Sequence, residues 1–117
     1  MPTQIKALMK QVIVYSSIGN KSTEVESSDC YITIPALIEV EATVSTEPYV
    51  NEGTSISYLT TNDSRKRSYV NGDYGDYWLR SPNASYDNYV YRVDSNGSIQ
   101  GITVASNNLG VLIEISF

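Results

Sequence analysis

The sequence has no histidine, and its 117 residues include one cysteine, one tryptophan and one phenylalanine. A lone cysteine excludes an intrachain disulfide, and with it the disulfide framework of many small secreted domains. The lack of histidine excludes zinc sites built from Cys and His, and any catalytic triad with His as its base. We therefore expect no metal, no cofactor and no enzymatic activity.

Positive charge and long apolar runs are also scarce. Eight Lys and Arg residues face thirteen Asp and Glu residues, for a net charge of −5. This balance argues against binding to nucleic acid or to an anionic membrane, both of which call for a basic surface. No apolar run approaches the roughly 18–20 residues that span a bilayer, so membrane insertion is not expected. Residues 1–4 lack the features of a secretory signal, which a longer natural chain would carry elsewhere.

Tyrosine dominates the aromatic residues, with ten of the twelve. A tyrosine offers a broad apolar face and a polar tip at low rotamer cost, which suits recognition surfaces. The alternative is a β protein that fills its strands with tyrosine. The length predicts one domain over residues 1–117, because two separate cores would be too small to offset their ordering entropy.

The first half of the chain gives weak signals. Residues 5–15 mix helical and β-branched positions, and we expect an extended segment. Residues 16–29 are polar and predict a loop. Residues 31–34 predict a short buried strand, and residues 35–40 a helix of about two turns that begins at proline. Residues 44–76 carry scattered turn formers and predict irregular structure with short ordered pieces.

The last forty residues give clearer signals. Residues 78–82 predict a short strand that ends at proline. Asn96-Gly97 lies between strands over 88–94 and 98–104, and predicts a hairpin with a two-residue type I′ turn. That turn would pair Asp94 with Ile99, Val93 with Gln100, Tyr91 with Ile102, and Tyr89 with Val104. The face predicted to be buried comprises Tyr89, Tyr91, Val93, Ile102 and Val104.

Strict alternation in residues 111–117 predicts a third strand of this region. Its apolar side chains would lie on one face, packed into the core: Val111, Ile113, Ile115 and Phe117. Because the core pattern runs to the last residue, we expect the domain to end there.

These segments resemble a domain of unknown function that is common in intestinal bacteria and their phages. The specific part is Tyr-Trp-Leu-Arg-Ser-Pro at 77–82, followed by Val93–Ser98 and Gly110-Val111. Supporting segments occur upstream in the same order: Ser28-Asp29, Glu52–Thr54, and Ser64–Tyr69 before Asn71-Gly72. The resemblance covers roughly residues 5–117. One departure is Leu112-Ile113-Glu114, where many relatives carry Arg-Pro.

The resemblance implies an α+β, C-type-lectin-like fold with mainly antiparallel strands, one or two short helices and much irregular loop. The same fold is used by target proteins of diversity-generating retroelements and by receptor-binding tips of phage tails. It therefore implies a scaffold that presents variable loops to a ligand.

A candidate ligand-binding surface follows from the predicted hairpin. Since Asn96 is at the closed end, the segments that enter and leave the hairpin must be neighbours at its open end. Their amide, hydroxyl and phenol groups suit sugar hydroxyls or polar protein epitopes. The candidate residues are Asn83, Ser85, Tyr86, Asp87, Asn88, Ser106, Asn107 and Asn108. The alternative is two polar loops whose Asn and Ser serve turns.

Two residues of the Trp-Leu-Arg-Ser-Pro string invite separate hypotheses. Trp78 is predicted to anchor the core. Arg80 is predicted to pair with a buried carboxylate, Glu39 or Glu52, since a fixed guanidinium can tie loops to a sheet. A ligand contact from Arg80 is the alternative.

The other charged groups point to structural roles. Residues 65–67 form the only basic cluster and predict a solvated loop. Asp73 and Asp76 could serve glycoside hydrolysis but fit an acidic loop better. Residues 94–98 resemble the start of a calcium loop, yet a hairpin turn explains them better. Cys30 opens an apolar strand, where a thiol is buried and inert.

The sequence thus predicts a non-catalytic domain that binds a cell-surface glycan or protein. It would be a receptor-binding part of a phage tail or of a bacterial surface protein, on a virion or outside the bacterial cell. A larger carrier protein that forms a homo-oligomer would add avidity. The alternative is a structural or assembly domain of a virion with no host ligand.

Overall fold

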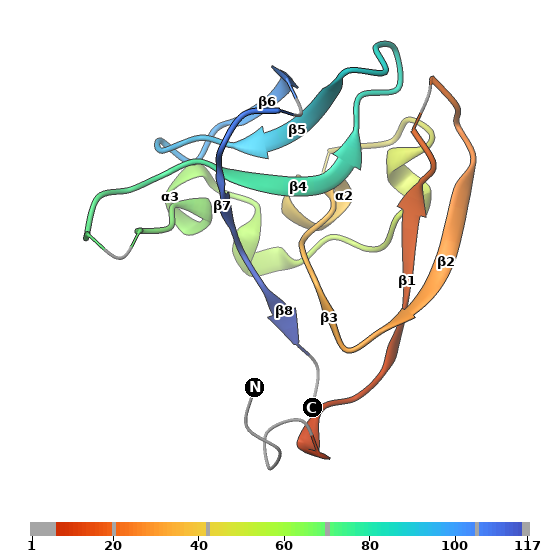
Figure 1. Cartoon of the computed structure of the whole chain (residues 1–117), viewed down its shortest axis with the longest axis horizontal. Helices are drawn as coiled ribbons and strands as arrows, with labels where there is room; N and C mark the ends of the chain where they lie inside the picture. Colours follow the sequence, from red (N-terminus) through yellow and green to blue (C-terminus); the bar gives the residue numbers. More distant parts are fainter. Residues whose placement is uncertain (1–6, 20, 42, 70, 105, 116–117) are drawn as a thin grey trace.

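Within the described residues, three short strands are followed by four short helical segments and then by five further strands (Figure 1). The computed structural model describes residues 7–19, 21–41, 43–69, 71–104 and 106–115. This part of the chain is a small α+β domain, made mostly of antiparallel strands. Its strands are β1 (Val12–Ser17), β2 (Val25–Cys30), β3 (Ile32–Thr33), β4 (Tyr77–Pro82), β5 (Tyr89–Val93), β6 (Ile99–Val104), β7 (Gly110–Val111) and β8 (Glu114–Ile115). Its helical segments are α2 (Leu37–Val40), η1 (Tyr49–Asn51), η2 (Ser57–Leu59) and α3 (Asn62–Arg65).

The strands form three sheets. The largest has the order β6-β5-β4-β7, in which β4 and β7 run parallel and the other neighbours antiparallel. Strands β1 and β2 form a separate hairpin, and β3 pairs with β8 through two residue pairs. The two small sheets therefore bring both ends of the described chain to one side of the large sheet (Figure 1).

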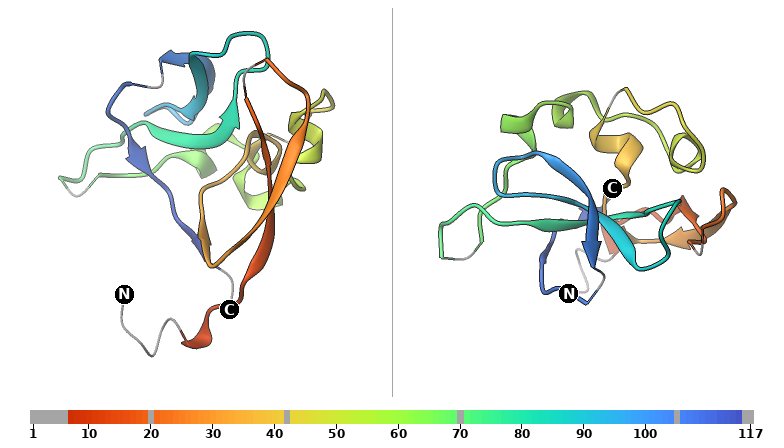
Figure 2. Two further views of the ribbon diagram at one scale, coloured as in Figure 1. Left: turned by 45° about the vertical axis from the view of Figure 1, so that its right-hand side comes forward. Right: turned by 90° about the horizontal axis from the view of Figure 1, so that it is seen from above.

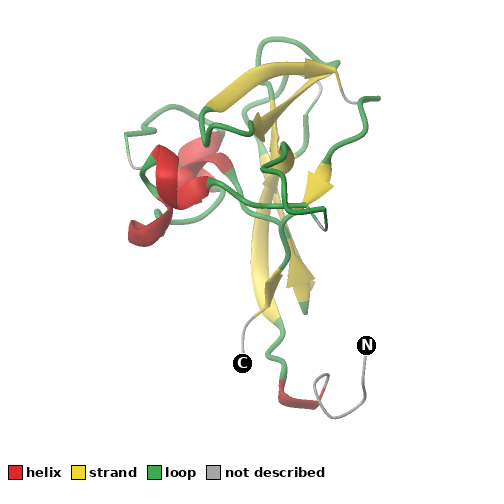
Figure 3. Cartoon of the chain, turned by 90° about the vertical axis from the view of Figure 1, so that its left-hand side faces the viewer, coloured by secondary structure: helices red, strands yellow, loops and turns green. Residues whose placement is uncertain are grey.

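The core lies between the large sheet and one layer of helical segments (Figures 2 and 3). Along β4, Tyr77, Leu79 and Ser81 are buried, whereas the residues between them are half-buried. This alternation follows from the two-residue repeat of a strand. The remaining buried residues of the core come from α2, η1, η2 and β5: Leu37, Val40, Tyr49, Leu59 and Val93.

The N-terminal third differs from the prediction. Residues 25–30 form strand β2 rather than a loop, because six residue pairs with β1 hold this polar segment extended. Strand β3 forms inside 31–34, but Ile32 keeps 45% of its surface exposed, so the prediction of a buried strand is wrong. Helix α2 is a single turn that begins at Leu37, with Ala36 as its N-cap, rather than two turns from proline. The extended segment predicted over 5–15 forms only from residue 12, where β1 begins, because Ala7 and Leu8 are helical. Residues 5 and 6 lie outside the described residues.

The middle of the chain and β4 agree with the prediction. Residues 44–76 hold only η1, η2 and α3 as regular elements among the described residues, and β4 covers 77–82. Helix α3 begins at a capping box, in which the Thr61 hydroxyl accepts from the Ser64 N–H and the Ser64 hydroxyl accepts from the Thr61 N–H. Such a box satisfies backbone donors that the first helical turn leaves without partners.

The β5–β6 hairpin forms, but its turn is not of type I′. Gly97 has a φ of 79°, and it is the only residue between 94 and 98 with a positive φ. Its N–H donates to Asp94 O, while the Asp94 N–H donates to Ser98 O. Val93 therefore pairs with Ile99, one residue away from the predicted register. An irregularity between Val90 and Arg92 absorbs the shift, so that Tyr89 pairs with Val104 as predicted.

Two of the predicted apolar faces are wrong in part. The single strand predicted over 111–117 does not form, because β7 and β8 are separated by Leu112 and Ile113 and belong to different sheets. Val111 and Ile113 are 61% and 56% exposed, while Leu112 packs against the core, so the predicted inward face is also wrong at these positions. In the hairpin, Val93 is buried but Val104 is 42% exposed. The side chains of Ile102, Ile115 and Phe117 lie outside the described residues. Trp78 is half-buried on the face of β4 that points away from the core, so it is not the predicted anchor.

Candidate functional site

The predicted binding surface lies at the open end of the β5–β6 hairpin. The pair between Tyr89 and Val104 places residues 83–88 and 106–108 at the same end of the two strands. Ser85–Asn88 and Ser106–Asn108 are exposed, whereas Asn83 is half-buried. The seven exposed residues combine hydroxyl, amide, carboxylate and phenol groups.

Asn83 fixes the first of these segments rather than presenting its amide to solvent. Its Nδ2 donates to Gly101 O at 2.7 Å. Its Oδ1 accepts from the N–H groups of Ser85 at 2.9 Å and Tyr86 at 3.3 Å. These bonds form an Asx-type turn, the alternative weighed for this residue. Of the candidate residues, Asn83 is thus a positioning residue.

Aromatic contacts support the same segment. The Tyr86 ring is 56% exposed and meets the Tyr89 ring edge-on, with 5.6 Å between centroids. Below them, the Tyr49 hydroxyl accepts from the Ala84 N–H at 2.7 Å. Burial raises the pKa of Tyr49 to about 12, so this hydroxyl stays neutral at ordinary pH. The loop is therefore tied to the core at two successive residues.

The second segment has fewer ties. The Asn107 N–H donates to Val104 O at 3.0 Å, which closes a turn directly after β6. The side chains of Ser106, Asn107 and Asn108 make no hydrogen bond to another described residue in the structure. They leave their donors and acceptors available to a ligand.

A second polar centre surrounds Arg80 of β4, whose side chain is 10% exposed. The guanidinium donates to Glu39 Oε1 at 3.2 Å, which confirms the predicted ion pair with a buried carboxylate. Its other bonds go to the carbonyl oxygens of Tyr15, Ile34 and Glu52 and to Thr33 Oγ1. Arg80 thereby joins β1, β3, α2 and the segment after η1 to the large sheet. These five bonds hold the surrounding segments together. They leave no N–H group of Nε or Nη2 free to contact a ligand in this arrangement.

Glu52 is the most deeply buried carboxylate of this centre, at 1% exposure. Its Oε2 accepts from the Ser17 N–H at 2.9 Å and its Oε1 from the Ser81 hydroxyl at 2.8 Å. The same Ser81 hydroxyl oxygen accepts from the Leu37 N–H, which caps helix α2. Burial raises the pKa of Glu52, and its hydrogen bonds and Arg80 oppose that rise. Glu52 therefore pairs with Ser17 and Ser81, and meets Arg80 through its backbone oxygen.

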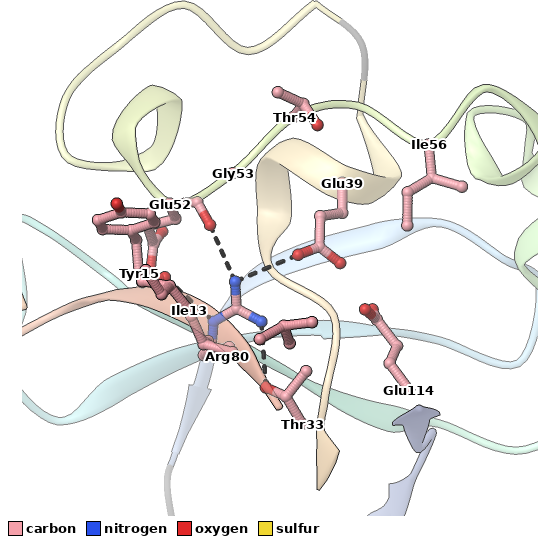
Figure 4. A pocket seen from close by; sticks show the side chains of 12 residues that line it. Ile13, Tyr15, Thr33, Glu39, Glu52, Gly53, Thr54, Ile56, Arg80 and Glu114 are labelled. Atoms are coloured by element: carbon pink, nitrogen blue, oxygen red, sulfur yellow. Dashed lines mark hydrogen bonds and ion pairs between the residues drawn. The ribbon is translucent and has the colours of Figure 1, made fainter. Parts of the chain in front are cut away.

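A cavity of about 310 Å³ opens beside this centre (Figure 4). One wall is β1, with Ile13 and Tyr15 at the rim. The opposite wall carries Glu39 from α2 and Glu114 from β8, whose carboxyl groups point toward each other in Figure 4. Burial, and after it the Glu39 carboxylate, raise the pKa of Glu114 to about 8.

The remaining charged groups are structural. Asp76 pairs with Arg92 at 2.8 Å, and the Asp94 carboxylate accepts from the N–H groups of Asn96 and Ser98 within the hairpin turn. Cys30 is half-buried at the end of β2 rather than fully buried as predicted. Within the described ranges, no group of three or more His, Cys, Asp or Glu side chains is placed to hold a metal ion. No helix among the described residues has the length and apolar character to cross a membrane.

The comparison with protein families decides what the chain is related to. The family model described as "Domain of unknown function (DUF6273)" matches residues 1–112. The chain belongs to the DUF6273 family. The match covers every described element from β1 to β7, and both segments of the candidate surface. Comparisons with curated proteins and with solved structures found no match.

Sequence reasoning missed one important residue of this DUF6273 domain. Arg65 was predicted to lie in a solvated loop, yet its side chain is 4% exposed. It donates to Gly97 O at 2.7 Å, to Val40 O at 2.8 Å and to Asn62 Oδ1 at 2.5 Å. Its burial was not predicted because Lys66 and Arg67 follow it, and a run of three basic residues is typical of solvent-facing segments.

Proposed function

We propose that this DUF6273 domain is a non-catalytic ligand-binding module with a C-type-lectin-like fold, which recognises a cell-surface glycan or protein. The observation that carries the proposal is the exposure of Ser85–Asn88 and Ser106–Asn108 at one end of a hairpin. Exposed tyrosine and amide side chains on loops anchored in a rigid frame are typical of recognition surfaces. The mixed α+β architecture with short helices is compatible with the fold that we propose.

The anchoring of the first loop supports the same proposal. Asn83 and Tyr49 hold its backbone, so a ligand would meet a segment that is already ordered. A preorganised loop pays less conformational entropy on binding than a free one. Tyr86 would supply the main contact, because its ring combines a large exposed face with a hydroxyl group.

The setting that we propose is a phage tail or a bacterial surface protein. A single surface of this size gives weak binding, and repeated copies on an oligomeric carrier would raise the overall avidity. The partner is therefore a glycan or protein on a cell, rather than a nucleic acid or a membrane interior.

Binding of the purified chain to a glycan array and to bacterial cells would test the proposal. The double variant Tyr86→Ala plus Asn107→Ala should lose at least about tenfold in binding, since each truncation removes a ligand contact of about 1 kcal/mol or more. The matched control is Tyr74→Ala plus Asn96→Ala, which removes an exposed asparagine and a tyrosine that is 57% exposed, against 56% for Tyr86, both away from the open end of the hairpin. Equal binding of the two double variants would contradict the assigned surface.

A second candidate is an assembly role within a virion, and one observation favours it. Tyr58, Val111 and Ile113 are 72%, 61% and 56% exposed, and Tyr58 and Ile113 line one cavity. Apolar side chains that gather on a surface mark protein contacts. The double variant Val111→Thr plus Ile113→Thr should then reduce association with partner subunits in sedimentation experiments, and leave cell binding unchanged. Unaltered sedimentation would exclude this role for the surface.

A further inference from the structure

Strand β8 is held to the rest of the domain by few backbone contacts. Within the part of the chain that the structure describes, it pairs with β3 only through Ile32 with Ile115 and Thr33 with Glu114. The Glu114 side chain reaches away from this pair toward Glu39 on α2 (Figure 4). A contact between these two side chains would therefore join the C-terminal strand to the helical layer.

The two carboxyl groups each leave one oxygen unexplained. Glu39 Oε1 bonds Arg80, but Glu39 Oε2 and Glu114 Oε1 are buried and have no hydrogen-bond partner among the described residues. A buried oxygen without a partner is costly, and two neighbouring carboxylates cannot both stay ionised in a buried site. One proton resolves both problems, because a protonated carboxyl becomes a donor to the other.

We propose that Glu39 and Glu114 share one proton, and that this acid–carboxylate pair is a latch that holds strand β8 on α2 and opens when the proton leaves. The proton bridges two elements that no regular sheet or helix pairing joins. Loss of the proton would leave two negative charges face to face. The latch is independent of the proposed ligand surface.

The charged groups around the pair set the pH at which the latch opens. Arg80 from β4 stabilises the ionised form, whereas Glu52 after η1 adds negative charge near Glu39. Arg67, after α3, lines the second cavity beside Glu114. Burial outweighs Arg80 and raises the pKa of Glu114 to about 8, so the shared proton persists at neutral pH. The five hydrogen bonds of Arg80 leave its guanidinium committed, so it cannot turn to neutralise a second carboxylate.

Opening of the latch would change the surface of the domain. The 310 Å³ cavity beside β1 and a second cavity of about 360 Å³ beside η2 share Ile56 and Glu114 as lining residues. Glu114 thus stands between the two cavities. Its release from Glu39 would connect them into one groove along the inner side of the C-terminal segment.

NMR on the complete chain would test the latch. The side-chain carboxyl carbon of Glu114 should titrate with a midpoint near 8. Amide exchange in the β3–β8 pair should accelerate at least about tenfold between pH 6.5 and 9.5, relative to amides of the β5–β6 pair at the same pH. This ratio removes the base catalysis that all amides share.

A conservative variant separates the latch from general effects of pH. In Glu114→Gln, the amide donates to Glu39 at every pH, so the exchange ratio should become constant. The control Glu24→Gln removes an exposed carboxylate and should keep the pH dependence of the natural chain. A Glu114 midpoint below 6, or a constant ratio in the natural chain, would overturn the proposal. These two measurements use the natural chain and decide the question even if Glu114→Gln fails to fold.

Discussion

Replacement of Arg65 by methionine should be among the most damaging single changes in the domain. The guanidinium donates to three backbone carbonyl oxygens, those of Gly97, Val40 and Leu59, and to Asn62 Oδ1. A buried acceptor left without its donor costs about 1–3 kcal/mol. Methionine regains part of that loss, since it fills a similar volume without a charge to desolvate. We expect a net loss of about 3–4 kcal/mol in the free energy of unfolding.

Urea and thermal unfolding would measure this loss, and the melting temperature should fall by roughly 10–15 °C in a domain of this size. The matched control is Arg67→Met. Among the described residues, its guanidinium bonds only the carbonyl oxygens of Ser64 and Lys66, which are its near neighbours in sequence, so the loss should stay below about 1 kcal/mol. Equal losses for the two variants would refute the assignment of Arg65 as the link between α2, α3 and the hairpin turn.

Three further predictions concern single groups. Gly97→Ala should destabilise the domain by about 2 kcal/mol or more in urea unfolding, because Gly97 has a φ of 79° and an added Cβ would overlap the Asn62 carbonyl oxygen. Gly72→Ala is the control and should cost less, because Gly72 also has a positive φ but an added Cβ would lie in open space. Tyr49→Phe should lower stability by about 1 kcal/mol and speed amide exchange at Ala84, which loses its acceptor. Stability should fall as pH rises from about 5 to 8, by at most about 1.4 kcal/mol per unit from Glu114, because the folded state keeps a proton that the unfolded chain has lost; Glu114→Gln should flatten this part of the profile.

The sequence predicted best where local chemistry and packing agree. Strands β4, β5 and β6 follow from β-branched and aromatic residues bounded by turn formers, and they form as expected. The ion pair of Arg80 with Glu39 could also be anticipated, because an arginine inside an apolar strand needs a carboxylate. The position of the candidate loops followed from the hairpin alone.

Other features depend on partners that a single sequence does not reveal. The polar residues of strand β2 by themselves favour a loop. They are extended because the strand pairs with β1. The alternation at 111–117 predicts a strand with two distinct faces, but it does not determine which face packs against the core. Here Leu112 and Glu114 turn inward, and Val111 and Ile113 turn outward. Arg65 was missed because its burial comes from elements that are distant in sequence.

The bonds of Asn83 have a consequence for how this family can diversify. Since Asn83 and Ala84 hold the start of the loop, the exposed residues Ser85–Asn88 contribute little to folding. A library randomised at Ser85–Asn88 and Ser106–Asn108 should therefore consist largely of soluble, folded members. A library randomised at Asn83 should contain few soluble, folded members.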